Sequence, residues 1–311
     1  MFLSTENLPS HKCNSTPTLL TPPSPFNLNF SLTCGQIFGW KRIGQGFLGI
    51  IQNDLFFLEQ KGDTLTVLNL DKGDVKSEKE IQSKLSHFFR WDDDLAQIVK
   101  SWEKDRFLLK IISTFPGLRM IRQDPWECLV RFILSICSNI PKIERTLMQL
   151  SQYSGSAILV QHHSADNRNT SSYLIPLIPL PEVIASMKLE ALREIGMGFR
   201  AAYLKESARR ILEGFSLNFL RLEPYDSAKK KLMEFSGIGE KVADCILLFS
   251  LDHLEAFPVD VWMQKVLTKY YFRGKTKTPK YLSEWGRNHF GNCAGYAQQY
   301  LYHFARNSKG R

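Results

Sequence analysis

The spacing of hydrophobic residues changes along the chain from a strand pattern to a helix pattern. In residues 26–70, short apolar runs are divided by turn residues such as Asn53-Asp54 and Gly62-Asp63, an arrangement typical of an antiparallel meander. From residue 77 onward, apolar positions recur at helical spacing; the first set is Ile81, Leu85, Phe88 and Phe89. The pattern predicts a mainly α protein with an N-terminal antiparallel α+β domain.

Changes in composition predict three segments. Residues 1–25 are rich in Ser, Thr, Asn and Pro, so we expect a flexible N-terminal tail without regular structure. Residues 26–118 contain the strand pattern and are expected to form the antiparallel α+β domain. Residues 119–311 are expected to form a helical domain, in which residues 161–172 are a polar insertion without periodicity.

The strongest local pattern in the helical part is a glycine turn between two helices. Asp226 suits a helix N-cap ahead of a run of helix formers. Gly237 and Gly239 allow a tight turn whose main chain a phosphate can approach. We therefore predict a helix-hairpin-helix at about residues 226–250, followed by a loop at residues 257–261 that carries a carboxylate.

Two residues of this stretch are candidates for catalysis. Lys241 falls in the first turn of the second helix, and Asp260 follows 19 positions later. Most lysines are solvated surface residues. However, the positive end of a helix dipole and desolvation both favour a neutral amine, and a neutral amine is a nucleophile. Lys241 and Asp260 therefore form a candidate nucleophile and carboxylate pair.

The composition narrows the class of protein. The 311 residues carry a formal net charge of +9, which favours a polyanionic partner such as nucleic acid or a membrane surface. The six cysteines include no CxxC pair and no Cys/His cluster. This argues against a zinc or iron–sulfur site and is typical of an intracellular protein. No apolar run is long enough to cross a membrane, and no signal-peptide pattern is present.

The residues around Lys241 resemble the signature of a known family. Leu232-x4-Gly-Ile-Gly-x-Lys-Val-Ala-Asp-Cys245, followed by Pro258-Val-Asp260, is similar to the helix-hairpin-helix DNA glycosylase superfamily, and more narrowly to its 8-oxoguanine DNA glycosylase/lyase branch. Four further stretches match as well: Gly35-Gln-x-Phe-x-Trp40, Arg122-Gln-Asp-Pro-x-Glu-Cys128, Gly196-x-Gly-Phe-Arg-Ala-x-Tyr203 and Ala294-Gly-Tyr-Ala-Gln298.

The resemblance implies a fold, a reaction and a partner. The fold would be the helix-hairpin-helix glycosylase fold, with two helical lobes flanking a cleft beside the α+β domain. Lys241 would attack the sugar, and Asp260 would stabilise the positive charge that develops there. The Schiff base would then allow β-elimination. The partner would be double-stranded DNA containing oxidised guanine, gripped by the main chain at Gly237 and Gly239.

The resemblance also implies how the damaged base is chosen. The main-chain carbonyl of Gly35 would accept a hydrogen bond from the N7–H that oxidised guanine has and guanine lacks. Gln298 would bind the Watson–Crick edge, and Cys245 and Tyr302 would cover the two faces of the base. For Cys245 and Tyr302 the competing interpretation is core packing, because both fall in apolar helical patterns.

Residues elsewhere in the chain are implied to contact the opposite strand. Lys142 and Arg200 would face the opposite base, where the family recognises cytosine, and Phe199 would be a wedge in the opened stack unless it packs in the core. Cys137-Ser-Asn139 stands where the family favours asparagines. Since Lys142 also lacks the donor fork of arginine, we expect relaxed selectivity for the opposite base.

Cofactors and location follow from the same interpretation. We expect no required cofactor and no metal site formed by side chains, although the resemblance implies a monovalent cation at hairpin carbonyls. We expect a monomer without a membrane partner. Its location would be the nucleus in a eukaryote, or the cytoplasm and nucleoid in a prokaryote.

Other functions remain open from the residues alone. A helix-hairpin-helix glycosylase for oxidised pyrimidines would share the hairpin, but its iron–sulfur members need a C-terminal cysteine cluster that this chain lacks. A non-catalytic DNA-binding module would keep the glycines without needing both Lys241 and Asp260. A basic membrane-surface protein would need an amphipathic basic stripe, which is absent from the sequence.

Overall fold

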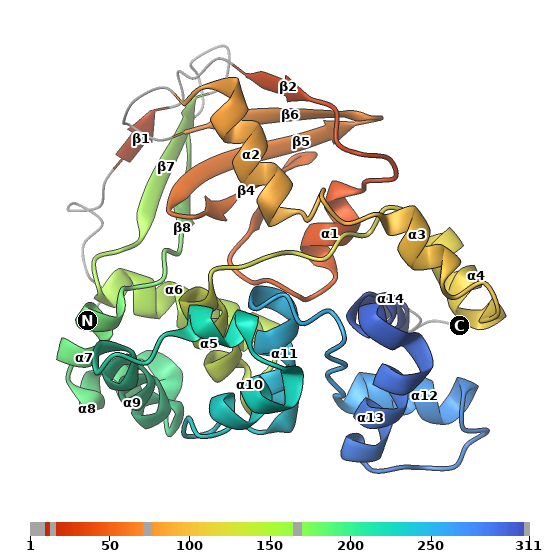
Figure 1. Ribbon diagram of the computed structural model, residues 1–311. Helices are drawn as coiled ribbons and strands as arrows, with labels where there is room; N and C mark the ends of the chain where they lie inside the picture. Colours follow the sequence, from red (N-terminus) through yellow and green to blue (C-terminus); the bar gives the residue numbers. More distant parts are fainter. Residues whose placement is uncertain (1–9, 13–16, 71–75, 164–169, 308–311) are drawn as a thin grey trace. The chain divides into compact units, whose positions relative to one another are not determined.

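The computed structural model describes residues 10–12, 17–70, 76–163 and 170–307. Over these residues the protein is mainly helical and carries a small antiparallel sheet from the N-terminal part of the chain (Figure 1). The predicted fold class is therefore confirmed. No helix in the described part of the chain is both long enough and apolar enough to span a membrane.

The chain divides into two compact units, each assembled from separated segments. The first unit contains Met1–Pro22, Phe38–Leu85 and Ile133–Phe215, and the second contains Pro23–Ile37, Ser86–Phe132 and Ser216–Arg311. The domains expected from the sequence, residues 26–118 and 119–311, are instead continuous segments that meet at residue 118. Since each unit collects distant segments, composition along the chain could not locate this division.

The first unit contains a five-stranded antiparallel sheet. Its order is β2 (Thr18–Leu20), β6 (Thr64–Asn69), β5 (Asp54–Lys61), β4 (Gly46–Ile51) and β3 (Lys41–Ile43). The strands β6, β5 and β4 lie side by side in Figure 1, as the meander pattern predicts. However, residues 37–40 lie before β3 and form no strand.

The expected tail without regular structure is wrong for Thr18–Leu20, because β2 pairs with β6 and buries Leu20. Residues 1–9 and 13–16 of that tail lie outside the described residues. The polar insertion also forms strands: β7 (Ile158–His163) pairs antiparallel with β8 (Thr170–Ile175), and β1 (Ser10–Lys12) pairs parallel with β7. Residues 164–169 of the insertion are outside the described part.

The two sheets of the first unit share one apolar core. Buried side chains from β4 and β5 meet those of β7 and β8; they include Leu48, Ile50, Leu55, Ile158, Val160 and Ile175. The polar residues from Gln161 onward obscure this packing in the sequence. A strand that buries one face needs only alternate apolar positions, and here few such positions are available.

The helices of the first unit lie before β7 and after β8 in the chain. They are α6 (Ile140–Tyr153), α7 (Pro181–Ser186), α8 (Leu189–Leu192), the distorted turn η2 (Arg193–Met197) and α9 (Arg200–Leu212). Pro141 lies within the first turn of α6 rather than interrupting a helix, because the first turn does not need the missing N–H. The division between the two units falls within α2 (Glu78–Phe88) and within α5 (Pro125–Ser135) along the chain.

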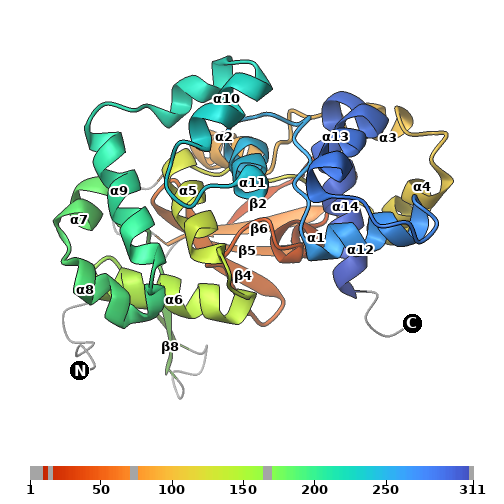
Figure 2. The same cartoon turned by 90° about the horizontal axis from the view of Figure 1, so that it is seen from below.

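The second unit is helical. It contains α1 (Leu28–Thr33), α3 (Leu95–Lys100), α4 (Arg106–Thr114), η3 (Leu217–Leu222), α10 (Tyr225–Leu232), α11 (Glu240–Ser250), α12 (Val261–Tyr270), α13 (Pro279–Phe290), η4 (Gly291–Cys293) and α14 (Ala294–Asn307). Helices α12, α13 and α14 pack on one another (Figure 2). Helix α11 is buried from Val242 to Ser250 and forms the centre of this unit.

Candidate active site

The predicted glycine hairpin joins α10 to α11. Gly237 adopts φ +81°, a backbone conformation that favours glycine. The amide of Ile238 donates to the carbonyl of Phe235 at 3.0 Å, which closes the turn. Gly239 is the N-cap of α11 and has no side chain to cap it. The first amides of α11 therefore have no intrahelical acceptor, as an anion site at a helix start requires.

Asp226 does not have its predicted place in this hairpin. Helix α10 begins at Tyr225 with Pro224 as N-cap, so Asp226 lies within the first turn. Its carboxylate is 3.6 Å from Nη1 of Arg287. A negative charge in the first turn still favours the helix dipole, which explains why the sequence pattern misplaced the helix start by only two positions.

Lys241 lies in the first turn of α11, and its amine lies over the face of an aromatic ring. Its Nζ is 5.3 Å from the centre of the Phe132 ring, and that ring stacks on Phe249 at 5.6 Å. One turn further along α11 lies Cys245, and the charge of Lys241 lowers the pKa of its thiol against the larger effect of burial. No described carboxylate forms an ion pair with Lys241. The amine is thus half-buried beside apolar groups rather than held by an acid.

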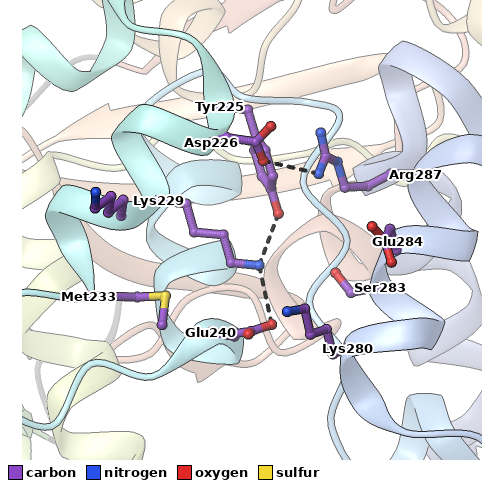
Figure 3. A pocket seen from close by; sticks show the side chains of 10 residues that line it. Tyr225, Asp226, Lys229, Met233, Glu240, Lys280, Ser283, Glu284 and Arg287 are labelled. Carbon is purple, nitrogen blue, oxygen red and sulfur yellow. Dashed lines mark hydrogen bonds and ion pairs between the residues drawn. The ribbon is translucent and has the colours of Figure 1, made fainter.

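The neighbouring acid, Glu240, turns toward a different lysine. Its carboxylate is 3.8 Å from Nζ of Lys229, which is also 3.0 Å from the buried Asp244. Tyr225 donates to the same Asp244 at 2.6 Å, and Ser283 is 3.2 Å from it. Figure 3 shows Lys229 reaching from α10 between Tyr225 and Glu240. This network joins α10, α11 and α13 and keeps Glu240 away from Lys241.

The network borders a cavity of about 280 Å³ on the outer side of the hairpin. Its wall mixes cations and acids, among them Lys230, Lys280 and Glu284, and Figure 3 shows side chains that line it. None of the predicted catalytic or base-binding residues lines this cavity. It is therefore a feature of the hairpin's support rather than of the candidate active site.

Asp260 is placed by the start of the next helix. It is the N-cap of α12, and its Oδ1 accepts a hydrogen bond from the amide of Met263 at 2.9 Å. Burial raises the pKa of Cys245 to about 11, and the charges of Asp244 and Asp260 act in the same direction. Burial also raises the pKa of Tyr302 to about 12, and the charge of Asp260 is the next largest cause. The negative charge of Asp260 therefore contributes to the raised pKa of both side chains. The Cys245 thiol stays protonated at neutral pH.

Gly35 lies against the ring of Tyr302. A Cβ atom at Gly35, which adopts φ +88°, would be 3.0 Å from Cε1 of Tyr302. The loop is held on both sides, because Gln299 donates to the carbonyl of Cys34 at 2.8 Å and Gln123 donates to that of Gln36 at 2.8 Å. The structure therefore fixes the main chain of Gly35 beside one of the predicted base-covering rings.

Gln298 carries an unsatisfied acceptor. It is only 5% exposed, and its Oε1 has no hydrogen-bond partner. An unpaired buried acceptor is costly and uncommon in a folded protein. Such an atom is expected where a ligand with N–H donors completes the bonding. Lys241, Asp260, Cys245, Gly35, Tyr302 and Gln298 all belong to the second unit.

The predicted contacts to the opposite strand belong to the first unit, and they differ from one another. Phe199 is 55% exposed, and among the described residues only Tyr203 forms a ring contact with it, at 5.8 Å. An exposed phenylalanine after Gly198 (φ +55°) suits the predicted wedge better than core packing. Lys142 is exposed, and Asn139 caps α6 by accepting from the Lys142 amide at 3.0 Å.

Arg200, which is expected to face the opposite base, is buried in the protein without DNA. It is 3% exposed, and its guanidinium donates to the carbonyls of Leu134 at 2.7 Å, Gly196 at 2.9 Å and Met197 at 3.0 Å. The guanidinium N–H groups that would bind a base instead donate to main-chain carbonyls at the end of α5, in the α5–α6 connection and in η2. Most of its donors are therefore already used in the protein without DNA, and the contact to the opposite base stays a prediction.

Sequence reasoning missed residues that complete the site. Phe132 supplies the floor under Lys241, and Arg306 lies over the ring of Tyr302, with its Cζ 5.7 Å from the ring centre. Arg306 follows Tyr302 by one helical turn, a spacing that could have signalled a shared face. Nothing local marks Phe132, which lies in a helix that is apolar nearly all round.

Two stretches of the chain match known families. Residues 18–129 match the N-terminal domain of 8-oxoguanine DNA glycosylase, and residues 145–288 match the HhH-GPD superfamily of base excision DNA repair proteins. The chain belongs to the helix-hairpin-helix DNA glycosylase superfamily. Because the first match covers the sheet of the N-terminal part, it assigns this glycosylase to the 8-oxoguanine DNA glycosylase/lyase branch.

Individual proteins show the extent of the similarity. A probable N-glycosylase/DNA lyase of Methanothermobacter thermautotrophicus is 28% identical over 251 residues, which are 74% of this chain and 77% of that protein. The Clostridium acetobutylicum 8-oxoguanine glycosylase/lyase, solved with double-stranded DNA containing cytosine opposite 8-oxoguanine, is 29% identical with a TM-score of 0.80; the match covers 91% of this chain and 93% of that one. MBOgg1 in complex with a low affinity DNA ligand gives a TM-score of 0.84 at 27% identity, over 96% of this chain and 98% of that one.

His303 gives the glycosylase a predicted dependence of stability on pH. Its ring is buried beside Phe115 and Phe30, and burial, followed by the charge of Arg306, lowers its pKa to about 4. The unfolded chain, with a histidine pKa of about 6.5, therefore binds the proton more readily. The stabilisation is complete above pH 6.5 and is lost as the pH falls through 4; we expect roughly 1–3 kcal/mol, allowing for solvent screening.

Urea unfolding of wild type and His303→Gln between pH 7 and pH 4 measures this contribution. The substitution removes the titrating group, so the difference in unfolding free energy between the two proteins should shift in favour of the variant as the pH falls. Two parallel curves over the whole range would contradict the assignment.

Proposed function

We propose that this glycosylase flips oxidised guanine, chiefly 8-oxoguanine opposite cytosine, out of double-stranded DNA, excises it and nicks the resulting abasic strand. The observation that carries this proposal is the amine of Lys241 at the start of the hairpin helix, unpaired by any described acid and lying over Phe132. A water-using glycosylase would need no such amine, whereas a glycosylase with lyase activity does.

The reaction follows from the two residues at the helix starts. In the proposed first step, Nζ of Lys241 bonds to C1′ of the sugar, and the bond from C1′ to N9 of the base breaks. Positive charge develops on the sugar, and the carboxylate of Asp260 stabilises it. The leaving base takes up the proton that the amine loses, and the C1′–O4′ bond then opens to give the protonated Schiff base. The Schiff base acidifies C2′–H, so loss of that proton breaks the C3′–O bond, expels the 3′ phosphate and nicks the strand.

The base-binding residues have complementary chemistry. The Gly35 carbonyl is proposed to accept from N7–H of 8-oxoguanine, while guanine would present a lone pair there and leave the carbonyl unpaired, at a cost of roughly 1–3 kcal/mol. The unsatisfied Oε1 of Gln298 is proposed to accept from the N–H groups on the Watson–Crick edge. Cys245, neutral at its raised pKa, and Tyr302 would cover the two faces of the base.

Backbone contacts are proposed at the glycine hairpin. The unpaired first amides of α11 can donate to a phosphate without reading sequence. No cluster of three or more His, Cys, Asp or Glu among the described residues could hold a metal. A monovalent cation at the hairpin would therefore be bound by main-chain carbonyls, and we retain it as a proposal. We also retain as proposals that the protein is intracellular and that it is a monomer.

The test is excision on duplexes that place C, A, G or T opposite 8-oxoguanine, with borohydride added to trap the covalent intermediate. We expect trapping and nicking with cytosine opposite. We also expect a relaxed preference of roughly 10-fold or less over the other bases, because Lys142 lacks a fork and the Arg200 donors are occupied. A strong preference for cytosine would reject the relaxed selectivity. Trapping on oxidised pyrimidines but not on 8-oxoguanine would reject the substrate.

A further inference from the structure

Arg306 forms part of the wall beside Gly35, although the proposed chemistry does not use it. A Cβ atom at Gly35 would lie 2.8 Å from Nη1 of Arg306, closer than any atom of Tyr302. The guanidinium also lies over the Tyr302 ring. Its charge lowers the pKa of His303 and acts against the rise in the pKa of Tyr302, in both cases as a secondary cause after burial. The positive charge is therefore felt within the base-binding wall.

Arg306 has no acid to hold it there. It is half-buried, and no carboxylate of the described residues pairs with it. Two other arginines of the second unit, the buried Arg90 and the half-buried Arg122, do have such a partner, because both bind Asp252. An arginine that is half-buried, unpaired and placed against a glycine main chain has its donors available for a ligand.

We propose that Arg306 is a further base-recognition residue of this glycosylase, which donates a hydrogen bond to the C8 carbonyl oxygen of 8-oxoguanine. The inference rests on the proposed substrate. In that base, N7–H and C8=O are neighbours in one five-membered ring. A base whose N7–H reaches the Gly35 carbonyl therefore places its C8 oxygen next to the Gly35 main chain, where Nη1 of Arg306 lies.

The electrostatics favour this arrangement over the undamaged base. The C8 oxygen and the Gly35 carbonyl oxygen both carry partial negative charge and would repel each other at this separation. A guanidinium beside them offsets that repulsion through a charge-assisted bond. Guanine has a C–H at C8, so it offers Arg306 no acceptor at that position. Arg306 would thus read the second atom that oxidation changes, while Gly35 reads the first.

The test compares Arg306→Gln with wild type in single-turnover reactions on matched duplexes. Excision of 8-oxoguanine should slow by roughly 10- to 100-fold, as expected for loss of one charge-assisted bond. Nicking of a preformed abasic site should stay near the wild-type rate, because that substrate has no base. On 8-thioguanine, which keeps N7–H but offers sulfur, a weak acceptor, the two proteins should differ little. Arg106→Gln, at an exposed arginine of α4, is the control.

Three outcomes would overturn the assignment. Unchanged excision of 8-oxoguanine would show that Arg306 does not read the base. An equal loss on abasic DNA would indicate a phosphate contact or a folding defect, and an equal loss on 8-thioguanine would indicate packing on Tyr302 instead. If wild type nicks abasic DNA but leaves 8-oxoguanine intact, the proposed substrate is wrong, which is distinguishable from a failure of Arg306 alone.

Discussion

Lys241→Gln will bind duplex DNA containing 8-oxoguanine but will lose excision, nicking and borohydride trapping together, by at least about 10³-fold. Glutamine has a similar length and keeps the polar end of the side chain, but its amide nitrogen has no available lone pair. Excision and nicking share the amine, so both steps should fail in one variant. Single-turnover gel assays and trapping on the same duplex measure the three losses.

The surroundings of Lys241 make this substitution informative. Because no described acid pairs with the amine, its replacement leaves no buried carboxylate unpaired, and the fold should be retained. What is lost besides the amine is the contact over Phe132, worth about 1 kcal/mol at most. Thermal unfolding should therefore change little.

A second lysine provides the matched control. Lys269 is exposed in the last turn of α12, with its Nζ 5.0 Å from the Tyr270 ring centre. Lys269→Gln removes the same charge and the same kind of aromatic contact away from the site. It should retain excision and trapping. Residual nicking by Lys241→Gln at the wild-type rate would assign the nucleophile to another residue.

Asp260→Asn will slow excision by roughly 10²- to 10³-fold while leaving the fold intact. The side chain has two separable functions. Its Oδ1 caps α12 through the amide of Met263, and asparagine caps a helix as well as aspartate does. Its negative charge is proposed to stabilise the developing positive charge on the sugar, and asparagine does not provide that charge. The rate measures the charge because the cap is preserved.

Asp260→Ala separates the two functions. It removes both cap and charge, so it should lose a similar factor in rate and in addition about 1 kcal/mol of unfolding free energy. The measurement pairs single-turnover excision with urea unfolding for both variants. If Asp260→Asn excises at the wild-type rate while Asp260→Ala does not, the residue acts through the helix start alone, and the proposed electrostatic function is wrong.

Local patterns predicted the elements that local rules govern. The meander from β4 to β6 and the hairpin around Gly237 were predictable because alternating apolar positions, turn residues and glycine conformations act within a few residues. The strands β7 and β8 were not predictable, since their pairing is decided by a core shared with distant β4 and β5. A polar segment becomes a strand when the rest of the fold supplies its apolar partner.

The residues of the candidate site also differ in whether the local sequence could predict them. Lys241 and Asp260 were identifiable because each lies at a helix start that its own neighbours define. The burial of Arg200 could not be predicted from a basic turn in the sequence, because carbonyls of the α5–α6 region, more than 60 residues away, accept its donors. Gln298 could be named from its motif, but only the folded chain leaves its Oε1 without a partner.

By itself, the sequence determined the hairpin, the amine and the carboxylate, since these depend on spacing along one short stretch. Only the tertiary structure decided what surrounds them. Phe132 lies under Lys241, Gly35 lies against Tyr302, and Arg306 lies beside both Gly35 and Tyr302. The contact of Phe132 with Lys241 and those of Gly35 with Tyr302 and Arg306 join residues that are far apart in the chain. Whether a side chain is buried, paired or available for a ligand therefore depends on more than its neighbours in sequence.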